Sequence, residues 1–355
     1  MTKYFLLLLT IVATSFTWLS CNNPIGPYKP VIWTQAEMQS LVIPAVWAAG
    51  NVIAVGAALP LSSCVLIFRS TDNGSTWQMT DSIHVNNHDP NTSLWTPIGI
   101  TFIYSGPYLF AGLAGGGGSI YRSSDYGMTW SDNGVSSPES SGDRPDILSF
   151  CNADGFIFAV ADQGVFRSSD NGTSWSLSSV GPYGCGGLAN IGTILFAFTG
   201  SDGIYRSMNN GLSWSVVFDT SLDFQGLASI GNKVFAGAFG KPLTGGVFVS
   251  SDYGTSWTHA DSGLTDHTVE TLIADGANLY AGTLSGSFIS TNSGASWSYV
   301  STGSSTDSLA VLSLAVSNSS LVVGTDDGVW IYPLSQRSNT KGSTNKWAQT
   351  KKEEP

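Results

Sequence analysis

Charged side chains are scarce in this sequence: Asp, Glu, Lys and Arg make up only 11% of its 355 residues, and long amphipathic helical patterns are absent. Without such patterns a helical bundle is excluded. Glycine and aromatic residues are plentiful instead, with 41 Gly, 12 Trp and 17 Phe. This composition is typical of many short strands joined by tight turns, so we expect an all-β protein.

Basic residues are fewer than acidic ones, 14 against 25, and several of them lie near the two ends. Without Lys3, the five basic residues after position 334, Glu353 and Glu354, the remaining 8 basic and 23 acidic residues give a net charge near −15. Such a surface is poorly suited to nucleic acids or other anionic polymers. We therefore expect no nucleic-acid partner.

Cysteine and histidine are rare, with four of each. Cys64, Cys151 and Cys185 show no metal-ligand spacing, and three is an odd number for an exported protein. Burial as small residues is the simpler interpretation for Cys151 and Cys185, and one disulfide among the three is the alternative. We expect neither a metal ion nor another cofactor.

The N-terminal segment reads as an export signal, with Lys3 before an apolar run from Phe5 to Val12 that is too short to predict a membrane span. Its end, Trp18 to Cys21, resembles a bacterial lipoprotein signal, although Trp18 stands where an aliphatic residue is usual. The resemblance implies lipidation of Cys21 and attachment to the cell envelope, on the periplasmic or surface side of the outer membrane; secretion without an anchor is the alternative. We expect a signal peptide over 1–21, a linker over 22–27 and membrane contact only through the lipid.

One eight-residue phrase recurs six times with a period of about 40 residues, which indicates propeller blades or a similar array. The six copies are STDNGSTW from Ser70, SSDYGMTW from Ser123, SSDNGTSW from Ser168, SMNNGLSW from Ser207, SSDYGTSW from Ser250 and STNSGASW from Ser290. Three strand-like runs precede a phrase: the first such as 147–150 or 271–274, the second such as 108–112 or 278–282, and the third such as 120–122 or 165–167. A fourth begins at the Trp of the phrase. Each unit therefore predicts a four-stranded antiparallel blade.

A seventh unit lies between Leu309 and Leu334, without the phrase and without a fourth strand. The N-terminal run from Pro30 to Thr34 is similar to the outer strands, so we expect it to supply the missing strand and close the ring. This predicts one seven-bladed domain over 28–334. The polar tail over 335–355 is expected to be disordered.

The phrase resembles the Asp-box of sialidase-like propellers, S-x-D-x-G-x-[ST]-W, also called the BNR repeat. The acidic or amide side chain is suited to bonding backbone N–H groups, Gly permits positive φ, and Trp starts the outer strand. We interpret these residues as structural rather than cation-binding, because two of the six Asp positions hold Asn. They are Asp72, Asp125, Asp170, Asn209, Asp252 and Asn292, with Trp77, Trp130, Trp175, Trp214, Trp257 and Trp297.

Ligand contacts in such a propeller are expected on the face opposite the phrases, where long connections surround the channel. Asp146 and Glu270 are the candidate catalytic carboxylates, with solvated loop residues as the alternative. Further candidates for ligand binding are His84, His88, Trp95, Arg144, Tyr183, Asp223 and His267. His84 and His88 belong to a different blade junction from His267, so we expect no shared metal.

The sialidase resemblance implies three arginines that grip a carboxylate, but the sequence departs from this pattern. Arg69, Arg122, Arg167 and Arg206 all stand just before a phrase, as repeated structural residues, and the first-blade F/Y-R-I-P motif is absent. Arg144 alone lies in a channel-side connection. We therefore expect no sialidase activity.

Two function classes remain open. The chain resembles photosystem II assembly factors and sortilin-like receptors, which implies an exported, monomeric, non-enzymatic binding or assembly module for a protein or glycan. It also resembles Asp-box xyloglucanases, which implies a glycoside hydrolase with two carboxylates, or a carbohydrate-binding protein that uses aromatics such as Trp95 and Tyr183. We favour the binding module, because those hydrolases generally use two propellers and this chain has one.

Overall fold

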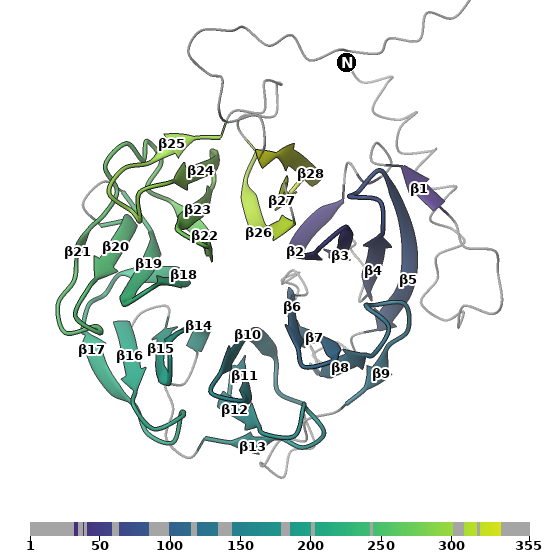
Figure 1. Cartoon of the computed structure of the whole chain (residues 1–355), viewed down its shortest axis with the longest axis horizontal. Helices are drawn as coiled ribbons and strands as arrows, with labels where there is room; N and C mark the ends of the chain where they lie inside the picture. The colour runs from purple at the N-terminus through teal and green to yellow at the C-terminus, as the bar shows by residue number, and fades with distance from the viewer. Residues whose placement is uncertain are drawn as a thin grey trace, which may run out of the picture.

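The computed structural model describes residues 32–34, 38, 41–58, 64–84, 99–114, 119–133, 144–178, 185–199, 203–241, 244–300, 309–317 and 320–334. They form seven antiparallel sheets, and Figure 1 shows these sheets as blades around a central opening. The predicted all-β, seven-bladed propeller is confirmed. Within the described part of the chain, no helix has the length and apolarity needed to cross a bilayer.

Each blade runs from an inner strand beside the opening to strands further out (Figure 1). The inner strands are β2 (Val42–Ala49), β6 (Gly99–Ser105), β10 (Ile147–Ala153), β14 (Cys185–Ile191), β18 (Asp223–Ile230), β22 (Val269–Asp275) and β26 (Val311–Ser317). The second strands are β3 (Val52–Ala58), β7 (Tyr108–Ala114), β11 (Phe156–Ala161), β15 (Ile194–Thr199), β19 (Lys233–Phe239), β23 (Asn278–Thr283) and β27 (Ser320–Thr325).

The third and outer strands are shorter than the first two in the second to sixth blades, and they flank the repeated phrase in the first six blades. The third strands are β4 (Cys64–Ser70), β8 (Ile120–Ser123), β12 (Gly164–Ser168), β16 (Gly203–Ser207), β20 (Gly246–Ser250), β24 (Gly286–Ser290) and β28 (Gly328–Pro333). The outer strands are β5 (Thr76–His84), β9 (Ser131–Asp132), β13 (Ser176–Leu177), β17 (Ser215–Phe218), β21 (Thr258–His259) and β25 (Ser298–Tyr299). The seventh blade has three strands among the described residues.

The N-terminal strand β1 (Ile32–Thr34) does not close the ring as expected. It lies on the outside of the first blade, antiparallel to β5, with Trp33 opposite Trp77 (Figure 1). The reason is edge length: β5 has nine residues, whereas β28 (Gly328–Pro333), the edge of the seventh blade that β1 was expected to cover, has six, so β5 offers the longer row of unpaired backbone groups.

Side-chain packing between the last and first blades closes the ring instead. The Ser313 hydroxyl on β26 donates to the Ile43 carbonyl on β2 at 3.1 Å, and the Gly328 N–H donates to the Leu41 carbonyl at 2.7 Å. Val322 and Val329 of the seventh blade share one buried cluster with residues of the first blade. The two ends of the propeller therefore meet through a continuous core.

The second strands form the centre of each blade because their side chains are apolar on both faces. Phe110, Phe158, Phe196 and Phe235 are each fully buried there, between neighbouring blades. Alternation of apolar and polar residues is weak on these strands, as expected for strands covered on both sides. Cys151 and Cys185 are buried free thiols in one of these clusters, and burial raises the pKa of each to about 12.

The six recurring phrases form turns between third and outer strands, here called the box turns: 70–77, 123–130, 168–175, 207–214, 250–257 and 290–297. In the third box turn, Asp170 accepts hydrogen bonds from the Ser174 hydroxyl at 2.6 Å and the Ser174 N–H at 2.9 Å, and the Ser168 hydroxyl donates to it at 2.8 Å. These bonds lower the pKa of Asp170 to about 2. Asn209 makes the corresponding contacts with Ser213 in the fourth turn.

The glycine of each box turn has a positive φ, and all of them except Gly127 also lie against a side chain of the preceding blade. A Cβ at Gly254 would be 2.8 Å from the Phe196 ring, and a Cβ at Gly294 would be 2.6 Å from the Phe235 ring. Glycine is therefore required for packing as well as for backbone conformation.

Candidate functional site

The two faces of the propeller are distinguished by strand direction. Because the strands are antiparallel, each inner strand begins, and each second strand ends, on the face opposite the box turns. We call this the loop face and its opposite the box face. Asp223, Asp266 and Glu270 lie at or just before the start of an inner strand, so they belong to the loop face as predicted from the sequence.

A β-bulge near the start of the inner strand interrupts the register in six of the seven blades. One extra residue on the inner strand changes the direction of the side chain there, a device common beside binding sites. The extra residue is Glu270 in the sixth blade, Gln225 in the fifth and Leu148 in the third. The bulge therefore places Glu270 at a position whose residue type differs from blade to blade.

The carboxylates of the fifth and sixth blades form an electrostatic cluster. Burial raises the pKa of Glu270, and the negative charges of Asp223 and Asp266 raise it further. Asp266 is partly buried, and hydrogen bonds from the Thr268 hydroxyl at 2.5 Å and N–H at 3.0 Å outweigh that burial and lower its pKa. Gln225 donates to the exposed Asp223 at 2.9 Å. The cluster therefore holds a half-buried carboxyl group beside accessible negative charge.

Two exposed apolar side chains lie next to this cluster. Phe239 at the end of β19 is 38% exposed and pairs with Asp223 across the sheet. Leu284 is 40% exposed, and its N–H donates to the Thr268 hydroxyl, which itself contacts Asp266. Carboxylates and apolar surface therefore alternate along the loop-face edges of two neighbouring blades, a feature that the sequence analysis missed.

The other candidate carboxylate, Asp146, lies apart from Glu270. It precedes β10 in the third blade, where its N–H bonds to Asp162 at 3.0 Å. Burial raises the pKa of Asp162, and the charge of Asp146 contributes to that increase. Asp146 and Glu270 each have their own carboxylate neighbours, and the described interactions do not connect the two.

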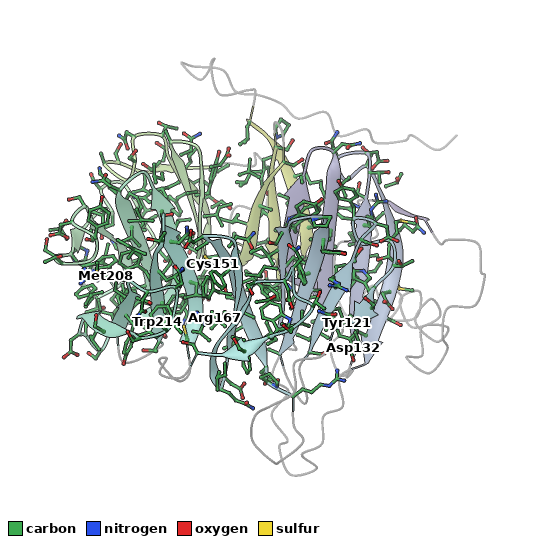
Figure 2. All side chains as sticks on the ribbon, turned by 60° about the horizontal axis from the view of Figure 1, so that its bottom comes forward. Tyr121, Asp132, Cys151, Arg167, Met208 and Trp214 are labelled. Atoms are coloured by element: carbon green, nitrogen blue, oxygen red, sulfur yellow. The ribbon has the colours of Figure 1, made fainter. Side chains whose placement is uncertain are left out.

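Arg144 makes a structural contact rather than facing a carboxylate ligand. Its guanidinium donates to Asp132 on the outer strand β9 at 2.6 Å and to the Ser119 hydroxyl at 2.8 Å. Asp132 and Tyr121, labelled in Figure 2, belong to the same edge of the second blade. Arg144 therefore secures a connection to that edge.

His267 and His259 both approach one carboxylate, that of Asp261, which follows the outer strand of the fifth blade. The Asp261 oxygen lies 3.5 Å from Nε2 of His267 and 3.3 Å from Nδ1 of His259. Among the residues that the structure describes, no group of three His, Cys, Asp or Glu side chains is arranged to hold a metal ion.

Several sequence candidates lie outside the described residues, namely Cys21, His88, Trp95 and Tyr183. His84 ends β5, and its side chain is also outside the description. Their roles in lipidation and ligand binding stay predictions.

The arginines that precede the box turns connect neighbouring blades, and we call each of these contacts a latch. Each guanidinium donates to the carbonyl of the fourth residue of the next blade's box turn: Arg69 to Tyr126 at 2.8 Å, Arg122 to Asn171 at 3.2 Å, Arg167 to Asn210 at 3.3 Å and Arg206 to Tyr253 at 2.7 Å. Figure 2 labels Arg167 near the fourth blade, which carries Met208 and Trp214. All four lie at the box face, so they are remote from the carboxylate cluster.

The chain was compared with known proteins. No family model matches it, and no curated protein matches it. Its fold is similar to a GH74 xyloglucanase from Xanthomonas campestris, with a TM-score of 0.60 and 14% identity over 86% of this chain and 54% of the xyloglucanase. The chain thus spans about half the length of that enzyme.

Two further structures of similar fold are not described as hydrolases. YCF48 bound to D1 peptide has a TM-score of 0.61 and 13% identity, over 88% of this chain and 99% of YCF48. The extracellular domain of a protein assigned as a one component system from B. thetaiotaomicron has a TM-score of 0.56 and 13% identity, over 86% of this chain and 40% of the other. At these identities the likeness shows a shared seven-bladed fold.

Proposed function

We propose that this chain is an exported, non-enzymatic binding module that holds a protein segment on the loop face of its fifth and sixth blades. The observation that carries the proposal is the alternation there of carboxylates and exposed apolar side chains, with Asp223 opposite Phe239 and Asp266 beside Leu284. This surface is complementary to a peptide in which basic and large apolar residues alternate. The net charge near −15 of the predicted propeller domain favours such a basic partner.

The comparisons support a binding role without identifying a partner. One propeller of similar fold is bound to a peptide, and another is an extracellular domain. Export agrees with the N-terminal signal predicted from the sequence, and lipid attachment at Cys21 belongs to the same proposal. The partner is proposed by its chemistry alone, as an extended segment with basic and apolar side chains.

A glycoside hydrolase is the second candidate, and one observation favours it. Glycosidases pair a carboxyl group of raised pKa with an accessible carboxylate, and Glu270 with its neighbour Asp223 meets that description. The xyloglucanase similarity is compatible with this candidate. We favour the binding module because large exposed apolar side chains flank the pair.

The two candidates are separated by testing peptides and glycosides in parallel. The probes are an array of peptides with basic and apolar residues, an acidic array of equal length, and a panel of reporter glycosides including xyloglucan fragments. We expect binding to the basic array alone, weakened about tenfold by Asp223→Asn with Phe239→Ala and unchanged by Val216→Ala on an outer strand. Glycoside turnover that Glu270→Gln abolishes would replace this proposal with a hydrolase.

A further inference from the structure

The junction between the fifth and sixth blades lacks the latch that the preceding four junctions have. Val249 occupies the strand position that Arg206 holds in the blade before, two residues after a fully buried residue of β20 and directly before the box-turn serine. Valine has no side-chain group that can donate a hydrogen bond to the next box turn. The carbonyl of Ser293, which corresponds to the four carbonyls bonded by arginine, accepts no hydrogen bond from a described donor.

A cavity of about 300 Å³ lies at this junction. The lining residues that matter here are Lys233, Val249, Ala260, Asp261, Ser293 and Gly294. The small side chain of Ala260 also helps to keep the cavity open. The residues that stand three positions after the box tryptophan in the second, third and fourth blades are larger: Asn133, Ser178 and Val217. Asn133 and Ser178 both bond to the glycine carbonyl of the next box turn, which Ala260 has no side-chain group to do. Two small residues therefore leave the space open.

The equivalent junctions in the second and third blades show which side chain fills this space. At the second and third junctions the guanidinium also stacks on the first residue of the second strand, with Arg122 4.5 Å from the Tyr108 ring and Arg167 5.5 Å from the Phe156 ring. Lys233 takes that position in the fifth blade. Among the described contacts Lys233 forms no ion pair with Asp261 and no hydrogen bond with Ser293, so it does not substitute for the latch.

We propose that this rim cavity binds the side chain of an arginine presented by a partner protein. The guanidinium donates to the Ser293 carbonyl, as the chain's own arginines do to the equivalent carbonyls at the first four junctions, and the alkyl stem packs on Val249 and Ala260. On the cavity wall the negative charge of Asp261 offsets the positive charge of Lys233, which would otherwise repel a cation. The site lies at the outer rim near the box face, so it does not depend on the proposed loop-face function.

The test is an NMR titration of the full chain with three peptides that are otherwise uncharged and differ only at a central arginine, lysine or citrulline. We expect the arginine peptide to shift the amide signals of Ser293, Gly294 and Ala295 in a saturable manner. The lysine peptide should bind more weakly, and the uncharged citrulline peptide about tenfold more weakly than arginine. Equal binding of citrulline, or saturable shifts confined to other residues, would overturn the proposal.

A matched pair of variants locates the site. Val249→Arg places an arginine in the cavity and should abolish peptide binding, whereas Val216→Arg adds the same residue to the exposed outer strand β17 and should leave it intact. Asp261→Asn, which keeps the shape of the wall, should weaken arginine binding by about threefold. Thermal melts confirm that each variant is folded, and binding that survives Val249→Arg would place the peptide elsewhere.

Discussion

The first four blade junctions and the junction between the fifth and sixth blades meet the same packing requirement in different ways. At the first four, an arginine from one blade bonds to the box turn of the next. At the later junction Val249 leaves a cavity of about 300 Å³ beside an equivalent turn. The difference shows that the latch is an addition to the fold rather than a condition for it, because apolar packing between second strands continues around the ring.

The largest effect is expected from adding a methyl group to a box-turn glycine at a latched junction. Gly254→Ala should lower the free energy of unfolding by about 3 kcal/mol, because alanine is strained at φ +85° and its Cβ would lie 2.8 Å from the Phe196 ring. Gly294→Ala has a similar φ, and its Cβ would lie 2.6 Å from the fully buried Phe235 ring, so we expect at least as large a loss although Gly294 also borders the cavity. Urea denaturation measures both, and a much smaller loss for Gly294→Ala would show that the cavity gives the Phe235 ring room to move.

Removing a latch should have the next largest effect. Arg122→Ala should cost about 2 kcal/mol, since it removes a charge-assisted hydrogen bond and the stacking on Tyr108. Arg206→Ala should cost about 1 kcal/mol, because Ile194 stands where Tyr108 does and offers no ring. The same denaturation experiment compares the two, and a larger loss for Arg206→Ala would argue against the stacking.

Installing a latch where none exists reverses the comparison. The double variant Lys233→Tyr, Val249→Arg reproduces the Tyr108 and Arg122 pair at the fifth blade and should raise stability by about 1 kcal/mol. Val249→Arg alone should gain less, because Lys233 repels the new charge. A thermal melt detects the gain, and a loss in both variants would mean that the cavity does not fit an arginine.

The smallest effect is on the pH dependence of stability, which should differ between box turns with Asp and box turns with Asn. The pKa of Asp170 is about 2 in the folded chain, below the ordinary value of 3.8, so its contribution to stability is present above about pH 4 and is lost as pH falls toward 2. Asp170→Asn should make stability depend less on pH in that window, as the natural Asn209 turn does. Denaturation midpoints at pH 5, 4 and 3 measure the slope; an unchanged slope would contradict the assignment.

The sequence predicted the blades well because each one is a repeated local pattern. The six phrases, their spacing and the apolar runs before them place the strands of the first six blades within a few residues, and the seventh without a phrase. The place of β1 was predicted incorrectly. The similarity of Ile32–Thr34 to the outer strands indicates that it can pair with the edge of a sheet, but it does not indicate which blade has the longest edge.

The candidate site was only partly predictable. Asp223, Asp266, His267 and Glu270 were found because loops follow from the strand pattern, but the exposure of Phe239 and Leu284 depends on how two blades meet. The cavity did leave a sequence signal: Val249 interrupts the run Phe-Arg-Ser or Tyr-Arg-Ser seen in four blades. This signal is found only by comparing the copies of the repeat and looking for the copy that differs.

The outer position of β1 also limits where the molecule could sit if Cys21 carries a lipid. Eleven peptide steps separate Cys21 from Ile32, a tether of at most about 40 Å when fully extended. The tether would then join the propeller at the outside of the first blade; the fifth blade lies across the ring from that point, and the sixth blade is separated from it by the seventh (Figure 1). The lipid would therefore be attached at least one blade away from both the loop-face cluster and the rim cavity.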